Sequence, residues 1–262
     1  MALANIEFYS DCLRRCVTCK VVIPTDVNGA DNPAYSRPMK TLVLLHGYSG
    51  MCSDWIWNSQ IMDVSNRYNL CVIMPSGENS FYLDGKETGR AYATFVGEEL
   101  LAFAGKTFGL SEKREDTYIG GFSMGGFGAI YLAFRFPDTF SKLFALSSAL
   151  IMHEVMEMQP GSHNGVANYD YFKLMFGEPT ALKNSMNNPE FLAKEIQKNG
   201  KVMPGIYMAC GTEDFLLKEN RAFDAFLTEQ NIAHVYQESA GAHDYNFWNT
   251  YLEPAVKWLL TE

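Results

Sequence analysis

The sequence lacks the features that define several classes of protein. Its longest apolar run, around Leu143 to Met152, is too short to span a bilayer. The 6 cysteines in 262 residues are far too few for a disulfide scaffold. The sequence also contains no internal repeat, low-complexity tract or Pro-rich linker that would point to a second domain. We therefore expect residues 1–262 to form a single folded domain that is neither fibrous nor membrane-spanning.

Positive charge is also scarce. The chain has 21 Lys and Arg against 30 Asp and Glu, which gives a net charge of −9. An acidic field repels phosphate backbones and anionic lipids, so we expect neither a nucleic-acid nor a membrane partner. The amino-terminal residues contain no apolar signal segment, and they carry Glu7 and Asp11 where a signal needs positive charge. These features predict a cytoplasmic protein.

Cys16 and Cys19 form a CxxC pair, a spacing that occurs in zinc and redox sites. The surrounding residues 15–23 are rich in β-branched side chains and predict a strand. Positions three apart on a strand face opposite sides of the sheet, so these two sulfurs cannot share a metal ion. We expect reduced, mostly buried thiols and no metal site.

Short apolar runs alternate with stretches of helical spacing along most of the chain. The runs are bounded by turn signals and fit strands that are buried on both faces of a parallel sheet. Besides residues 15–23, we expect strands at residues 41–45, 70–74, 117–120, 143–147, 206–210 and 235–238. We expect helices at residues 98–108, 124–136, 219–229 and 254–260. This order predicts an α/β fold.

Residues 151–203 interrupt the alternation. They are rich in Met, Asn and Pro, and they contain two expected helices, at residues 169–176 and 189–198, but no obvious strand. The segment is too long for an ordinary connection between a helix and a strand. It is either a small cap over an active site or a surface excursion that covers one edge of the sheet.

A glycine-rich turn follows the expected strand at residues 117–120. It contains the pattern Gly121-x-Ser123-x-Gly125 and leads into an apolar helix. A sharp strand-to-helix turn lifts a serine hydroxyl above the sheet, strains its backbone and leaves room only for tiny side chains two residues before and after it. The turn also places Ser123 at a helix amino terminus, which favours developing negative charge. Ser123 is therefore the expected nucleophile.

A serine nucleophile needs a histidine base that is held by a carboxylate, and in this fold both follow the serine in the chain. His243 is the expected base, because it lies in a small-residue loop directly after the last expected strand. Asp214 follows the preceding strand and is the expected acid. Glu213 in the same role, and a purely helix-capping role for Asp214, are the alternatives.

Two backbone N–H groups are needed to hold the oxyanion of the tetrahedral intermediate. One is expected from Met124, the residue after the nucleophile, and the other from Tyr48, in the loop after the strand at residues 41–45. In the same loop, we interpret His46 as a side chain that stabilises the loop and not as a ligand.

Several aromatic residues cluster in or beside the loops that should surround Ser123. Among them, Trp55, Tyr82 and Phe122 are predicted to contact substrate, in an aromatic-walled pocket for small acyl groups or cinnamic acids. The alternative is that these side chains only pack in the core or at its edge.

Together these segments resemble the esterase D and tributyrin esterase branch of the α/β-hydrolases, which also includes S-formylglutathione hydrolases, feruloyl esterases and relatives of the mycolyltransferase antigens. The resemblance covers residues 17–260, and its most specific stretches are residues 44–50, 74–75, 80–82, 98–100, 113–116 and 121–126. S-formylglutathione hydrolases commonly read Ser-Gly-Leu-Thr-Cys at the oxyanion loop. This chain reads His46-Gly47-Tyr48-Ser49-Gly50 instead, which disfavours a glutathione thioester.

The resemblance implies an α/β-hydrolase fold, with a mostly parallel central sheet, helices on both faces and a small cap insertion. It also implies hydrolysis of carboxylic esters without a cofactor, and a homodimer or homotetramer. Asp214 and His243 fall where the family keeps its acid and base.

From these observations we expect a serine carboxylesterase that hydrolyses short-chain or aromatic-acid esters through an acyl-enzyme. An S-formylglutathione hydrolase or an acyltransferase with the same triad is one alternative. A non-catalytic binding protein that kept the hydrolase fold is the alternative from another class.

Overall fold

One sheet forms the centre of the molecule. In the computed structural model, which describes residues 1–25, 30 and 32–261, eight strands are joined in the order β1-β2-β4-β3-β5-β6-β7-β8. β2 runs antiparallel to both of its neighbours, and all other neighbours pair in parallel. The strands are β1 Ala2–Ser10, β2 Arg15–Ile23, β3 Lys40–Leu45, β4 Leu70–Pro75, β5 Thr117–Phe122, β6 Lys142–Leu146, β7 Gly205–Gly211 and β8 Val235–Ser239. The predicted α/β class is confirmed.

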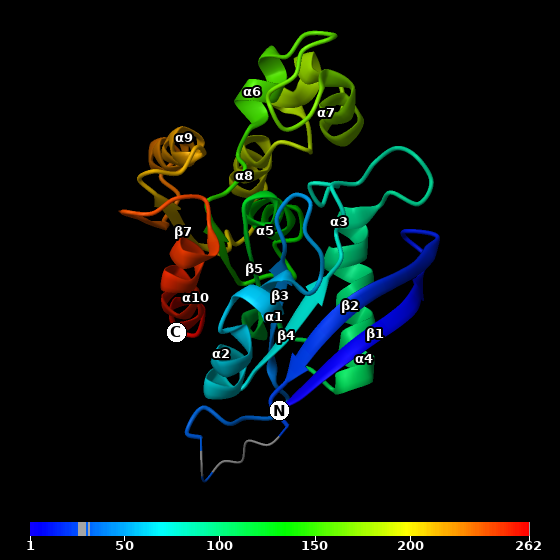
Figure 1. The fold of residues 1–262 in the computed structure, drawn as a ribbon, viewed down its shortest axis with the longest axis vertical. Helices are drawn as coiled ribbons and strands as arrows, with labels where there is room; N and C mark the ends of the chain where they lie inside the picture. Colours follow the sequence, from blue (N-terminus) through cyan, green and yellow to red (C-terminus); the bar gives the residue numbers. More distant parts are fainter. Residues whose placement is uncertain (26–29, 31, 262) are drawn as a thin grey trace.

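Helices cover both faces of this sheet (Figure 1). They are α1 Asp54–Asn58, α2 Ile61–Tyr68, α3 Tyr92–Thr94, α4 Leu100–Phe108, α5 Met124–Arg135, α6 Met152–Glu157, α7 Tyr169–Phe176, α8 Pro189–Lys198, α9 Leu217–Glu229 and α10 Tyr245–Leu259. A π-helical turn, Phe95–Glu99, precedes α4, and short 3₁₀ turns occupy Arg114–Asp116 and Pro179–Asn184.

The alternation of side chains along each strand divides the core into two layers. On β3, Val43 and Leu45 face the layer that α4, α5, α8 and α9 cover, whereas Leu42 and Leu44 face the layer that α1, α2 and α10 cover. Both faces of the central strands are therefore buried, which explains why these strands appear in the sequence as short continuous apolar runs.

β1 is not among the strands expected from the sequence. Its residues alternate in burial: Ala4, Ile6 and Phe8 pack against the core, while Leu3 and Tyr9 are exposed. This is the period-2 pattern of a half-buried edge strand. The signal was therefore present in the sequence.

The last helix is longer than predicted. α10 begins at Tyr245, nine residues before the expected start at Pro254, and contains that proline in its interior. The Asp244 carboxylate caps it by accepting the N–H groups of Asn246 and Phe247. A row of buried aromatic and aliphatic side chains then holds α10 against the sheet, and this tertiary packing outweighs the unfavourable interior proline.

The strand order reverses between β3 and β5. β4 follows β3 on one side, while β6, β7 and β8 follow β5 on the other side. Parallel strands end at the same edge of a sheet, and ligands bind at the point where the order reverses. The loops after β3 and β5 therefore meet above residues Leu45 and Gly121, which are paired across the two strands.

Residues 151–203 form the helices α6, α7 and α8, of which α7 and α8 have the predicted bounds and α6 was not predicted. Figure 1 shows α6 and α7 at the top of the view, at the end of the molecule opposite to both chain termini. The aromatic side chains Phe172 and Phe176 of α7 join the core layer that also contains α5.

The cysteines are all free, and the two of the CxxC pair lie on opposite faces of β2, with Cys16 exposed and Cys19 buried. This confirms the predicted geometry. Over the described part of the chain, no group of three or more His, Cys, Asp or Glu side chains is placed to hold a metal ion. Within the same residues, no helix combines the length and the apolar character needed to cross a membrane.

Candidate active site

Ser123 lies in the turn between β5 and α5, with φ 54° and ψ −122°. A positive φ is strained for any residue other than glycine, and such strain persists only where the surroundings enforce it. A Cβ atom on Gly121 would lie 2.4 Å from the carbonyl oxygen of Gly125, and one on Gly125 would lie 2.5 Å from that of Leu45. The predicted need for tiny side chains on both sides of the serine is confirmed.

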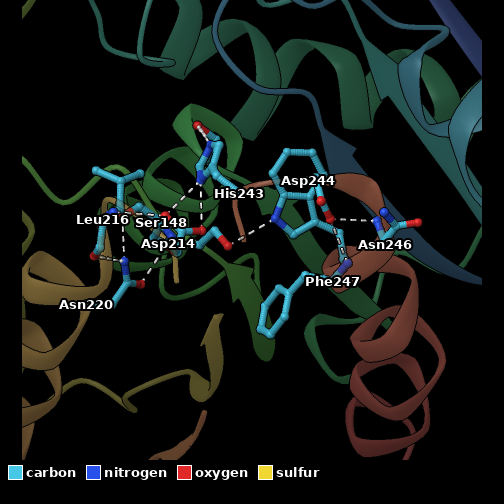
Figure 2. Close-up of polar contacts among 11 residues, drawn as sticks. Ser148, Asp214, Leu216, Asn220, His243, Asp244, Asn246 and Phe247 are labelled. Carbon is cyan, nitrogen blue, oxygen red and sulfur yellow. Dashed lines mark hydrogen bonds and ion pairs between the residues drawn. The ribbon is translucent and has the colours of Figure 1, made fainter. Parts of the chain in front are cut away.

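The side chains of Ser123, His243 and Asp214 meet at the ends of β5, β8 and β7. The Ser123 Oγ is 3.0 Å from Nε2 of His243. The other ring nitrogen, Nδ1, lies 3.0 and 2.9 Å from the two carboxylate oxygens of Asp214. The Asp214 side chain is fully buried, whereas that of His243 is 17% exposed. Figure 2 shows His243 and Asp214 joined in this way.

Asp214 is held as a carboxylate. Burial alone would raise its pKa, but hydrogen bonds outweigh burial, and the pKa of this group lies below its ordinary value. The donors are the ring of His243, the Leu216 N–H and the Ser147 side chain. The Leu216 N–H lies 2.8 Å from Oδ1, so the carboxylate both holds the imidazole and satisfies the backbone just before α9.

The other acidic residues near His243 have different partners. Glu213 is exposed and accepts the Gly241 N–H, which supports the loop that carries His243. Asp244 caps α10, as Figure 2 shows. Of the residues weighed for the acid, Asp214 is therefore the one that contacts the ring.

The residues that support this arrangement are not among those expected from the sequence. Trp248 of α10 meets the His243 ring edge-on at 5.1 Å, and its Nε1–H donates to the Ser147 hydroxyl at 3.0 Å. Asn220 of α9 is fully buried and pairs with the backbone of Ser148, accepting its N–H at 3.1 Å and donating to its carbonyl at 2.9 Å. The two hydrogen-bonded pairs, Trp248 with Ser147 and Asn220 with Ser148, are 101 and 72 residues apart in the chain, so no local pattern could have revealed them.

The loop of residues 46–50, here called the oxyanion loop, follows β3. Nε2 of the buried His46 accepts the Gly77 N–H at 2.8 Å, and Nδ1 lies 2.7 Å from the Gly47 carbonyl, which requires Nδ1 to carry the proton. Burial lowers the pKa of His46 and so favours this neutral ring. The interpretation of His46 as a loop-stabilising side chain is confirmed.

A cavity of about 850 Å³ opens at Ser123 and His243. Tyr48, Met124 and Phe81 line it beside the nucleophile. The insertion adds Ile151, Met152, His153, Glu154, Glu157, Asn164, Val166, Phe172 and Glu190 to the wall, and α9 adds Lys218, Glu219, Ala222 and Phe223. Ala149 and Leu150, just before the insertion, and Phe215 and Leu216, just before α9, complete it. The predicted donors Tyr48 and Met124 are thus brought to the site, and their roles as N–H donors stay a prediction.

The predicted substrate contacts of Trp55, Tyr82 and Phe122 are corrected. All three are buried, and none of them lines the cavity. Trp55 donates to the Leu45 carbonyl at 2.9 Å, and Tyr82 donates to the His46 carbonyl at 3.0 Å. Phe122 points into the core layer on the side of α10, because it precedes Ser123 on a strand whose side chains alternate. These aromatics hold the loops in place.

Comparison with known proteins finds esterases, both by family model and by sequence identity. A family model described as "Putative esterase" matches residues 11–259. A protein named "Acetyl esterase" from Caldicellulosiruptor saccharolyticus is 40% identical over 261 residues, which cover 99% of this chain and 98% of that protein.

Two solved structures from Staphylococcus aureus are each 26% identical to this chain. One is a substrate-bound fluorophosphonate-binding serine hydrolase F, with a TM-score of 0.86 over 100% of this chain and 99% of that one. The other is an S-formylglutathione hydrolase, with a TM-score of 0.83 over the whole of both chains. The predicted α/β-hydrolase fold is confirmed.

Replacing Trp55 by Phe should lower stability and leave substrate binding unchanged. The substitution removes the donor to the Leu45 carbonyl and leaves a small void, at a cost of about 2 kcal/mol in the free energy of unfolding. Denaturant unfolding measures that cost, and KM for a short ester should stay within about twofold, since core packing does not reach the substrate. A changed KM with unchanged stability would restore the substrate-contact interpretation.

Proposed function

The chain belongs to this esterase family and is a serine carboxylic ester hydrolase, and we propose that it hydrolyses short-chain or aromatic-acid esters through an acyl-enzyme on Ser123. The observation that carries the proposal is the 3.0 Å contact between Ser123 Oγ and a histidine whose other nitrogen rests on a buried carboxylate. The 40% identical acetyl esterase supports a small acyl group.

In the proposed mechanism, Ser123 Oγ attacks the ester carbonyl while Nε2 of His243 takes its proton. Asp214 keeps the Nδ1 proton in place and stabilises the imidazolium that forms. The N–H groups of Met124 and Tyr48 hold the oxyanion of the tetrahedral intermediate. Because Ser123 lies at the amino terminus of α5, the helix dipole adds to this stabilisation.

The second half of the cycle reuses the same groups. His243 returns its proton to the departing alcohol, which leaves the acyl group on Ser123. Water is then activated by His243, attacks the acyl-enzyme and releases the acid. Every proton transfer therefore passes through one ring that is 17% exposed at the cavity wall.

Residues 151–203 act as a cap in this proposal. They supply one wall of the cavity, and a surface excursion over a sheet edge would not contribute side chains beside the nucleophile. The aromatic and aliphatic side chains of this cap, with Tyr48 and Phe81, give an apolar surface for an acyl group.

Charge argues for neutral substrates. Four carboxylates line the cavity, at Glu154, Glu157, Glu190 and Glu219, against Lys218 and two histidines, His153 and His243. A second candidate, a glutathione thioester, is favoured by the S-formylglutathione hydrolase neighbour, but its carboxylates would face this acidic wall. The same triad also serves acyl transfer, and a binding protein without chemistry would have no reason to keep it intact. The homodimer or homotetramer and the cytoplasmic location stay predictions.

Replacing Asp214 by Asn should lower kcat by about 10⁴, because the amide no longer fixes the reactive tautomer of His243. Glu213→Gln is the matched control, since a glutamine oxygen can still accept the Gly241 N–H, and its kcat should stay within about threefold of the wild type. Steady-state kinetics on one activated acetyl ester measures both. A larger loss in Glu213→Gln than in Asp214→Asn would transfer the acid's role to Glu213.

A neutral butyryl ester should be hydrolysed with a kcat/KM about tenfold higher than a hemisuccinyl ester of the same alcohol. The two acyl chains have the same length, so the difference reports the negative charge that meets the acidic wall. High salt should reduce the ratio, because exposed charges are screened. Equal rates for the two esters at low salt would contradict a preference for neutral substrates.

A further inference from the structure

The loop of residues 77–82, here called the bridge loop, lies between the oxyanion loop and the cap. On its inner side it contacts the oxyanion loop three times. The Gly77 N–H donates to His46 at 2.8 Å, the Tyr82 hydroxyl donates to the His46 carbonyl at 3.0 Å, and the Ser49 N–H donates to Oδ1 of Asn79 at 2.7 Å. The oxyanion loop therefore takes its position from the bridge loop.

Both loops contain backbone that needs external support. Ser49 has φ 63°, and the consecutive residues Phe81 and Tyr82 have φ 51° and 56°. Left-handed angles at such residues persist only where neighbouring groups enforce them. Part of the support is internal, because the Ser80 hydroxyl donates to the Gly77 carbonyl at 2.6 Å and accepts the Tyr82 N–H at 3.0 Å. Glu78 is held from outside the loop by the side chains of Arg15 and Tyr92. The cap adds further support.

Tyr171 of α7 is the cap residue that contacts both loops. Its hydroxyl donates to the Asn79 carbonyl at 2.6 Å, and its ring meets the Tyr48 ring edge-on at 5.9 Å. The hydroxyl is protonated at neutral pH and serves as a donor, and burial raises its pKa further above the ordinary value. Its own N–H is bound at 2.9 Å by the side chain of Asn168, which caps α7. Tyr171 is thus fixed at the start of the helix.

We propose that Tyr171 is a positioning residue for catalysis: through Asn79 it holds the oxyanion loop where the Tyr48 N–H meets the oxyanion. The inference rests on the proposed function, in which Tyr48 supplies that donor. Oxyanion donors work only within a narrow distance range, and the oxyanion exists only in the transition state. Displacing the loop therefore lowers kcat and leaves ground-state binding unchanged.

The test replaces Tyr171 by Phe, which removes the hydroxyl and keeps the ring beside Tyr48. We expect kcat to fall about tenfold, with KM within about twofold, since a displaced donor costs less than a deleted one. Tyr169→Phe is the control: it removes a hydroxyl from the same helix, two residues earlier and outside these contacts, and its kcat should match the wild type.

Asn79→Ala removes the side chain that binds the Ser49 N–H and tests the path by a second route. We expect Asn79→Ala to lower kcat by a similar factor and to leave KM unchanged. In a protein that already carries Asn79→Ala, Tyr171→Phe should lower kcat by less than about threefold, because both substitutions interrupt the same connection from Tyr171 through Asn79 to Ser49. This variant also decides the matter if Tyr171→Phe fails to show a cooperative thermal transition.

The outcomes separate the two proposals. Additive losses, a raised KM with unchanged kcat, or an equal loss in Tyr169→Phe would each overturn the role of Tyr171. If Ser123→Ala retains the wild-type rate, the proposed function fails first. A wild type that depends on Ser123, together with an unaffected Tyr171→Phe, overturns the positioning role alone.

Discussion

The left-handed backbone of Ser123 is the constraint around which the site is arranged. At φ 54° the residue cannot relax, because β5 is buried below it, the Leu146 carbonyl accepts its N–H at 2.9 Å, and its own carbonyl accepts the Ala149 N–H at 2.9 Å. The closest packing lies at the neighbouring glycines, where any Cβ would meet backbone. The strained turn leaves the hydroxyl facing a histidine at 3.0 Å, so the conformation and the chemistry depend on the same contacts.

The reversal of the strand order explains why three distant segments reach that serine. β3 and β5 are paired neighbours, so the loops that follow them rise side by side. β7 and β8 end at the same edge and carry the carboxylate and the imidazole, and the Glu213 N–H donates to the Gly241 carbonyl at 3.0 Å, which holds their loops together. The insertion then covers this edge and contributes to the cavity. The site is therefore built by topology as much as by any single motif.

The sequence predicted those parts of the site that depend on local order. Ser123 and Asp214 each follow a buried strand in a recognisable turn, and His243 follows the half-exposed edge strand β8, so their positions could be read from the chain. The burial of the aromatic residues that were expected to contact substrate could not be predicted from the sequence. Tyr82 turns inward at φ 56°, and the contacts of Trp55 depend on how α1 packs. The hydrogen bonds of Asn220 to Ser148 and of Trp248 to Ser147 join residues more than seventy positions apart, which leaves no local signal for them. β1 is different, because its alternation of inward-facing apolar side chains with exposed ones is present in the sequence.

The central claim is that Ser123 is the nucleophile that the fold presents to an ester. The most direct measurement is reaction with a fluorophosphonate, followed by mass spectrometry of the intact protein and its peptides. The account predicts one adduct, on the peptide that contains Ser123, none in Ser123→Ala, and a loss of about 10⁶ in kcat in that variant. An adduct on another residue, or a Ser123→Ala variant that keeps its esterase activity, would contradict it.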